Sequence, residues 1–183
     1  TGDTSQKLTL MKTSADSLKK SADALTNTSL WEKKKIKKKD EETGKETEVE
    51  DYDWEAITKA VKSFIEDYND VVKEAGESNT KDVLRNAAWM TGMTDKSSNM
   101  LAKIGITIGK GNKLELDEDA LKKSDFSSLK SVFTGYNSYA SKISQKATSI
   151  GNAANRATAT YTNNGTYSKV DSSLTSSKID KEV

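Results

Sequence analysis

Apolar residues recur every three to four positions along most of the chain, which is the spacing of one buried helix face. The first stripe lies near the N-terminus, is flanked by polar side chains and ends at Asn27. Its members are Leu8, Met11, Ala15, Leu18, Ala22 and Leu25. A narrow stripe of this kind is typical of a helix that packs against partners as in a coiled coil.

The second stripe is the most regular in the chain and predicts a helix from Trp54 to about Ala75. Asp53 or Asp51, near its start, suits the N-terminal cap, and Gly76 suits the C-terminal cap. Its apolar members are Trp54, Ile57, Val61, Phe64, Tyr68, Val71 and Ala75. At this spacing the aromatic rings belong to a core seam.

A further helical segment follows, and Ser78 or Asn79 can cap its start. We expect it to break or bend near Gly92, because glycine is a weak helix former. Trp89 lies out of phase with the apolar residues around it. Its side chain is therefore predicted to be exposed.

The last stripe runs from Phe126 to Tyr161, and Gly135 is expected to interrupt it. The stripe consists of Phe126, Leu129, Phe133, Tyr136, Ala140, Ile143, Ala147, Ile150, Ala154, Ala157 and Tyr161. This predicts a short helix ending near Phe133 and a long helix from about Asn137 to Thr162. Residues 163–183 are polar and nearly aperiodic, so we expect a weakly ordered tail.

Between these helices, residues 104–117 show the alternation of a β-hairpin. Isoleucines at 104, 106 and 108 alternate with glycine and threonine, and Leu114 and Leu116 alternate after a glycine-containing turn. The strands would have one apolar face, which helices must cover.

Four carboxylates end this hairpin and begin the next segment: Glu115, Asp117, Glu118 and Asp119. A calcium loop needs oxygen ligands at alternating positions around a central glycine, and this cluster lacks that pattern. No nucleophile in the chain is paired with a recognisable base, so the acids give no reason to expect catalysis. Asp117 is instead placed to cap a following helix, whose positive end suits the acids.

Residues 33–39 form a lysine run that by itself suggests a nucleic-acid surface. An acidic segment at residues 46–51 follows directly, so a turn at residues 41–44 would bring opposite charges together. The expected cross-strand pairs are Lys39 with Glu46, Lys37 with Glu48, Ile36 with Val49 and Lys35 with Glu50. We interpret the segment as a charge-paired hairpin over about residues 31–54, with Trp31 approaching Trp54, in preference to a polyanion site or disorder.

The composition narrows the function classes. Hydrophobic residues make up 33% of the 183 residues and charged residues 31%, with a formal net charge of +1. This balance gives no reason to expect nucleic acid or an anionic membrane as partner. The chain has no cysteine and no histidine, which excludes thiolate metal sites and histidine-based catalysis. We predict no enzyme activity, no cofactor, no bound metal and no membrane insertion.

The predicted fold is mainly α: an elongated antiparallel helical bundle or coiled coil with two small β-hairpins. Residues 1–162 are expected to form one domain with hairpins at about residues 31–54 and 104–117, followed by the tail at residues 163–183. Three aromatic residues are candidate protein contacts: Trp89, Tyr136 and Tyr139.

Several of these segments resemble one known family. The motif IGIT at 104–107, the pattern L-x-L-D-E-D-x-L at 114–121 and the segment ending in F-T-G at 129–135 occur in order, after a similar helix at 61–72. They resemble the C-terminal half of bacterial flagellar filament cap proteins, also called flagellar hook-associated protein 2. The similarity covers roughly residues 52–135.

The resemblance implies a secreted, extracellular structural protein of the bacterial flagellum. Such a protein forms a ring-like homo-oligomer at the filament tip and helps flagellin to fold and insert, so its partners are flagellin and other copies of itself. Family members carry large β-rich head domains where this chain has only its charged hairpin, so we expect a minimal member or a fragment. The alternatives are a flagellin-related surface adhesin that binds host mucin or glycan, and flagellin itself.

Overall fold

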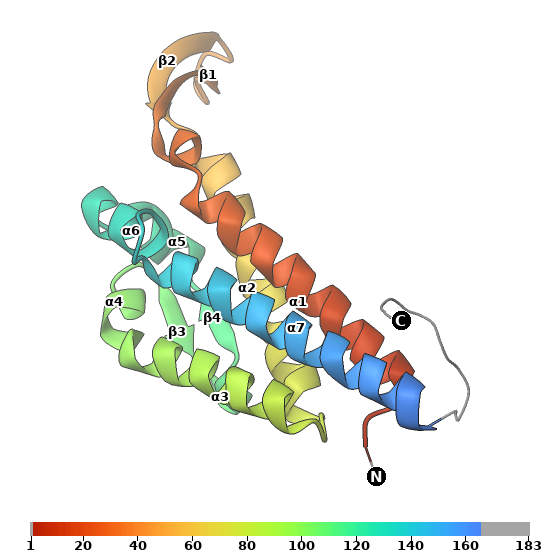
Figure 1. The fold of residues 1–183 in the computed structure, drawn as a ribbon. Coiled ribbons are helices and arrows are strands. Elements are labelled where there is room, and N and C mark those ends of the chain that lie inside the picture. Colours follow the sequence, from red (N-terminus) through yellow and green to blue (C-terminus); the bar gives the residue numbers. More distant parts are fainter. Residues whose placement is uncertain (1, 166–183) are drawn as a thin grey trace.

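A computed structural model describes residues 2–165 of the protein and the side chains of residues 2–160. The described part is mainly α-helical with two small antiparallel hairpins, which confirms the predicted fold class (Figure 1). The predicted polar tail lies almost entirely outside the described residues. The four long helices are α1 (Ser5–Thr26), α2 (Trp54–Gly76), α3 (Lys81–Lys96) and α7 (Tyr139–Gly165).

These four helices pack as an elongated up-and-down bundle. α1 packs against α7 and α2, and α3 packs against the same two helices, so each neighbour in the bundle is antiparallel (Figure 1). All six members of the first apolar stripe are buried on α1, as their spacing predicts. Alanines at positions such as 140, 147 and 154 of α7 are also fully buried. Small side chains there allow the close packing of α7 on α1.

Local caps begin the helices where the sequence indicates. The Asp53 side chain accepts a hydrogen bond from the Ala56 amide at 3.0 Å, and Asp117 accepts from the Ala120 amide at 3.1 Å. Gly76 is still part of α2, and Glu77 is the residue that follows the helix. The predicted glycine cap is therefore wrong by one residue.

The start and the break predicted for α3 are both wrong. Thr80 precedes the helix, because Ser78 and Asn79 hydrogen-bond to the Asp3 carboxylate instead. Gly92 does not interrupt α3, which runs on to Lys96 before the short α4 (Ser98–Ala102). One glycine costs a helix only about 1 kcal/mol, and the buried packing of neighbouring residues in α3 outweighs that cost.

The charged segment forms the predicted hairpin. It consists of the 3-10 turn η1 (Thr28–Trp31) and the strands β1 (Lys33–Lys39) and β2 (Glu46–Tyr52). The register is the expected one: Lys39 lies opposite Glu46, Lys37 opposite Glu48, Ile36 opposite Val49 and Lys35 opposite Glu50. Trp31 and Trp54 share one aromatic cluster, in which each ring centroid lies 6.1 Å from that of Phe126.

The second hairpin pairs β3 (Ile106–Ile108) with β4 (Leu114–Leu116) around the 3-10 turn η2 (Lys110–Asn112), and α5 (Glu118–Lys123) and α6 (Phe126–Phe133) follow. The Asn69 side chain on α2 donates to the Leu114 carbonyl at 3.0 Å and accepts from the Leu114 amide at 2.7 Å. The Asn69 side chain thus pairs the backbone donor and acceptor of Leu114, at the start of β4. Gly105 has a φ of +88°, and a Cβ there would lie 2.7 Å from the Asp117 carbonyl oxygen, so the position requires glycine.

Candidate protein-contact surface

Trp89 is exposed, as its helical phase predicts. It lies on α3 with 65% of its surface accessible. The Lys146 ammonium of α7 lies 4.0 Å from the centroid of the indole ring, which is cation–π geometry. One side of the ring is thus supported by the bundle. The remaining surface is open to a partner.

Apolar exposure is concentrated on the same part of the molecule. The large apolar side chains that the described structure leaves exposed are Leu10, Leu84, Trp89, Met100 and Tyr136. Three of them lie on α3 and α4. α3 packs on the bundle through Val83, Met90 and Thr94, so its opposite face meets solvent.

Tyr136 is 88% exposed and lies in the loop between α6 and α7. It therefore leaves the apolar stripe in which its spacing had placed it. Gly135, with a φ of +102°, turns the backbone at this point, and the Ser141 hydroxyl donates to the Tyr136 carbonyl at 2.9 Å. The loop backbone is held while the phenol ring projects into solvent.

Tyr139 is not a surface residue, which corrects its prediction as a contact. Only 4% of it is exposed, and its hydroxyl lies 2.8 Å from that of Thr94. The Thr94 hydroxyl also accepts from Tyr68 at 2.8 Å and bonds the Met90 carbonyl at 3.1 Å. Because the one Thr94 proton is used on that carbonyl, Tyr139 must donate to Thr94. The three hydroxyls link α2, α3 and α7.

Burial keeps both phenols in their protonated, donating form. Desolvation raises the pKa of Tyr68 to about 12, although the hydrogen bond with Thr94 opposes the rise. Burial likewise raises the pKa of Tyr139 well above its ordinary value. The hydroxyl network is therefore intact at neutral pH.

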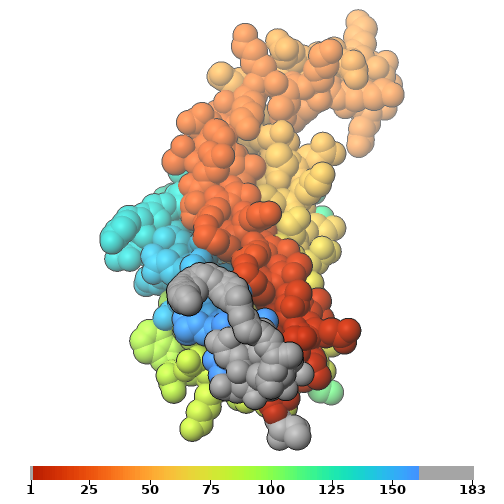
Figure 2. Space-filling view, turned by 45° about the vertical axis from the view of Figure 1, so that its right-hand side comes forward, coloured from red at the N-terminus to blue at the C-terminus, as the bar shows by residue number. Residues whose placement is uncertain are grey.

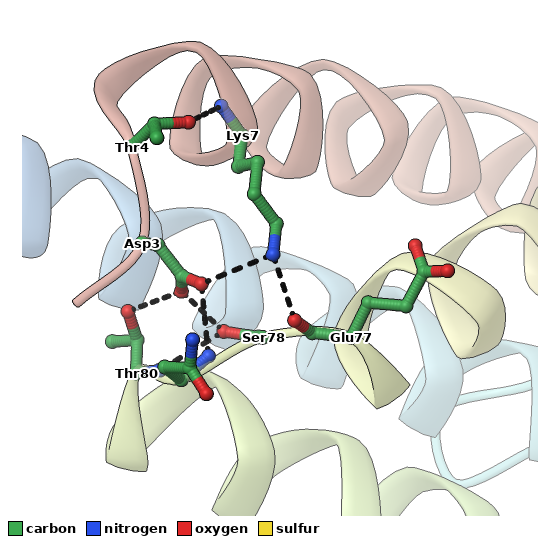
Figure 3. A network of polar contacts seen from close by, with 7 residues as sticks. Asp3, Thr4, Lys7, Glu77, Ser78 and Thr80 are labelled. Atoms are coloured by element: carbon green, nitrogen blue, oxygen red, sulfur yellow. Dashed lines mark hydrogen bonds and ion pairs between the residues drawn. The ribbon is translucent and has the colours of Figure 1, made fainter. Parts of the chain in front are cut away.

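A second network lies at the end of the bundle where α1 begins, opposite the charged hairpin (Figures 1 and 3). The Asp3 carboxylate accepts from the Ser78 and Thr80 hydroxyls at 2.6 Å each and from the Asn79 amide at 2.8 Å. The Lys7 ammonium lies 3.6 Å away. Burial disfavours the charged carboxylate, but these hydrogen bonds and Lys7 together lower the pKa of Asp3 to about 2. The start of α1 is thereby bound to the connection between α2 and α3.

Further polar bonds join α1 to its two neighbours along their length. Asp23 accepts from the Ser144 hydroxyl of α7 and from Lys19, both at 2.6 Å. Burial raises the pKa of Asp23, but these two donors outweigh it, so the pKa is lowered overall. On the other side, the Ser14 hydroxyl bonds the Glu74 carboxylate of α2 at 2.8 Å. These contacts set the register between helices, and their partners are too distant in sequence for a pattern to reveal.

The family model of the flagellar hook-associated protein 2 C-terminus matches residues 78–182, which is more than half of the chain. The chain belongs to this family. Members of the flagellar hook-associated protein 2 family are structural components of the bacterial flagellum, located outside the cell at the filament tip. No curated protein and no solved structure matches the chain.

The part that matches flagellar hook-associated protein 2 begins just before α3 and includes α3 to α7. It contains Trp89, Tyr136 and Tyr139, whereas α1, the charged hairpin and α2 lie outside the match. The helix at 61–72, which the resemblance included, is likewise outside it. The exposed aromatic residues therefore lie on the portion by which the family is recognised.

Among the described residues, no group of three or more acidic side chains is placed to hold a metal ion. A groove of about 500 Å³ lies between α2 and α5, where Lys62 and Glu118 form an exposed ion pair at 3.2 Å. Thr58 also lines this groove, and its hydroxyl is buried without a hydrogen-bond partner in the described part. None of the described helices is both long and apolar enough to cross a membrane.

Proposed function

We propose that this member of the flagellar hook-associated protein 2 family caps the flagellar filament. In this role it is exported, oligomerises at the filament tip and promotes the incorporation of flagellin. The observation that carries the proposal is the family match over residues 78–182. A match to hook-associated protein 2 favours the cap over flagellin itself.

The architecture supports a mechanical role. A cap must keep its contact surfaces in fixed relation while incoming subunits insert beneath it. The buried residues of all the long helices form one hydrophobic cluster. The networks around Asp3, Asp23 and Thr94 join neighbouring helices by direct hydrogen bonds. We therefore treat residues 1–162 as a single stiff domain.

The contact residues that we propose are Trp89 and Tyr136. Exposed aromatic rings on a rigid support provide large contact area at a low entropic cost, and they are enriched in the residues that dominate protein interfaces. Trp89 is supported by Lys146, and the backbone at Tyr136 is bonded to Ser141. Tyr139, which is buried, is no longer part of this set.

The proposal is tested in cells that lack the gene, by electron microscopy of filaments and by measuring unpolymerised flagellin in the culture supernatant. We expect short or missing filaments with leaked monomer, and recovery on return of the wild-type gene. Filaments of normal length without leaked flagellin would contradict the cap. That outcome would favour a surface adhesin, which saturable binding of the protein to mucin or glycan would then establish.

A further inference from the structure

The charged hairpin presents two free edges of opposite charge. β1 carries six lysines in seven residues, whereas β2 carries Glu46, Glu48, Glu50 and Asp51. The sheet has two strands only, so the outer edge of each strand has no strand partner within residues 2–165. The hairpin extends past the end of the bundle, away from the other elements (Figures 1 and 2). Both edges are therefore accessible to another molecule.

An aromatic cluster fixes the base of this hairpin to the bundle. The ring of Trp31 stacks on Phe133 with a centroid separation of 5.7 Å, and its indole nitrogen donates to the Leu25 carbonyl at 2.7 Å. Tyr52, at the end of β2, stacks on Phe126 at 3.7 Å. The hairpin thus starts from a packed base, which limits the directions in which its edges can point.

Most of the hairpin charges form no ion pair with the residues that the structure describes. Among the described residues, the ion pair within the hairpin is Lys38 with Asp51, at 2.7 Å. Glu46, Glu48 and Glu50 of β2 take part in none of the ion pairs in this part of the protein. Their carboxylates are exposed and remain available for lysines of another strand.

We propose that the hairpins of neighbouring copies pair edge to edge, with β1 of one copy against β2 of the next. The inference rests on the self-association that the proposed function includes, and it names the surface. If the strands of the two copies pair in the same register as within one hairpin, Lys35 and Lys37 of one copy face Glu50 and Glu48 of the next. Each charged strand then lies between two strands of opposite sign.

The charges also exclude the alternative pairings. Pairing β1 with β1 would oppose lysines to lysines, and pairing β2 with β2 would oppose carboxylates to carboxylates, both of which are unfavourable. A lysine-rich edge ordinarily prevents strand addition, and here it accepts only an acidic strand. The resulting contact is head-to-tail, which generates rings when the rotation closes. A two-fold dimer is not expected.

Engineered cysteines test this geometry directly, because the natural chain has none. Ile36→Cys and Val49→Cys change the central opposed pair of the hairpin and leave every charge in place. Adjacent strands lie about 5 Å apart, within disulfide reach, whereas strands two apart lie at about 10 Å, beyond it. We expect a disulfide-linked dimer when the two single variants are mixed and oxidised. Neither variant should give such a dimer alone.

Charge variants test the driving force by sedimentation velocity of the full chain at low salt. Lys35→Glu with Lys37→Glu should weaken self-association by about ten-fold or more, and so should Glu48→Lys with Glu50→Lys. Combining all four changes restores complementarity within and between hairpins and should restore association. Lys122→Glu with Lys123→Glu on α5 is the matched control and should leave association unchanged. Circular dichroism should show the same helical content in every variant.

Each contrary result is decisive. Disulfide dimers of either cysteine variant alone would overturn the head-to-tail pairing. A wild-type chain that stays monomeric at low salt, or association that survives either strand reversal, would overturn the role of the hairpin. Rejection of the cap function can be distinguished from rejection of the hairpin contact, because the gene deletion tests the cap function separately. Normal filaments in the deletion strain with mixed-variant cross-linking in solution would leave the hairpin contact standing and reject the cap.

Discussion

The hydroxyl oxygens of Thr94 and Tyr139 lie 2.8 Å apart inside the bundle and join α3 to α7. Both residues are almost fully buried, and the same Thr94 oxygen accepts from Tyr68 on α2. One threonine thus serves two phenols. Removing the Thr94 hydroxyl leaves two buried phenol donors without an acceptor. Removing one phenol hydroxyl leaves no donor of this network unpaired.

Thr94→Val should therefore destabilise the protein more than Tyr139→Phe. We expect Tyr139→Phe to lower the free energy of unfolding by about 0.5–1.5 kcal/mol and Thr94→Val by about 2–4 kcal/mol, measured by urea denaturation. Thr91→Val is the matched control, because within the described residues its hydroxyl bonds the Ala88 carbonyl of its own helix and no other helix. Equal losses for Thr94→Val and Thr91→Val would contradict the network.

Asp3→Asn should destabilise the protein in a pH-dependent way. We expect a loss of about 1.5–3 kcal/mol at pH 7, because three donors lose a charged acceptor. The carboxylate has a pKa lowered from 3.8 to about 2, so its stabilisation is complete above about pH 5 and disappears as the pH falls through 2.

The measurement is the difference in unfolding free energy between wild type and Asp3→Asn from pH 7 down to pH 2. This difference should be constant above about pH 5 and shrink below pH 4. Asp16→Asn removes an exposed ion pair with Lys12 and should change the stability by less than about 0.5 kcal/mol. A difference for Asp3→Asn that stayed constant down to pH 2 would show that its charge is unimportant.

Gly105→Ala and Gly92→Ala should shift the stability in opposite directions. At Gly105 the backbone is left-handed, and a Cβ would lie 2.9 Å from the Leu121 amide nitrogen as well as close to the Asp117 carbonyl. We expect a loss of at least about 2 kcal/mol. At Gly92 a Cβ meets nothing within 4 Å, so alanine should stabilise α3 by about 0.5–1 kcal/mol. Thermal unfolding followed by circular dichroism measures both.

Trp89→Ala should affect filament assembly without unfolding the protein. The Trp89 residue is 65% exposed, and its ring makes a cation–π contact with Lys146. Its removal should therefore lower the free energy of unfolding by less than about 1 kcal/mol. In a complemented deletion strain we expect shorter filaments and more flagellin in the supernatant. Leu10→Ala, at an exposed position on α1, is the control and should complement fully. Full complementation by Trp89→Ala would remove this residue from the contact surface.

The sequence alone determined the features that depend on neighbours along the chain. The register of β1 with β2 follows from alternation and from opposite charges separated by a short turn, which only one pairing satisfies. The caps by Asp53 and Asp117 follow from a carboxylate three residues before an unpaired amide. The apolar stripe of α1 follows from helical periodicity.

Only the tertiary structure decided which periodic positions meet a partner. Spacing placed Tyr136 in the seam, and aromatic character made Tyr139 a candidate contact, yet the first is exposed and the second is buried. The difference arises because Gly135 redirects the loop and because Thr94, 45 positions away, offers an acceptor to Tyr139. Asp3 likewise finds its donors at positions 78–80. Such contacts depend on how whole helices pack, and no local pattern carries that information.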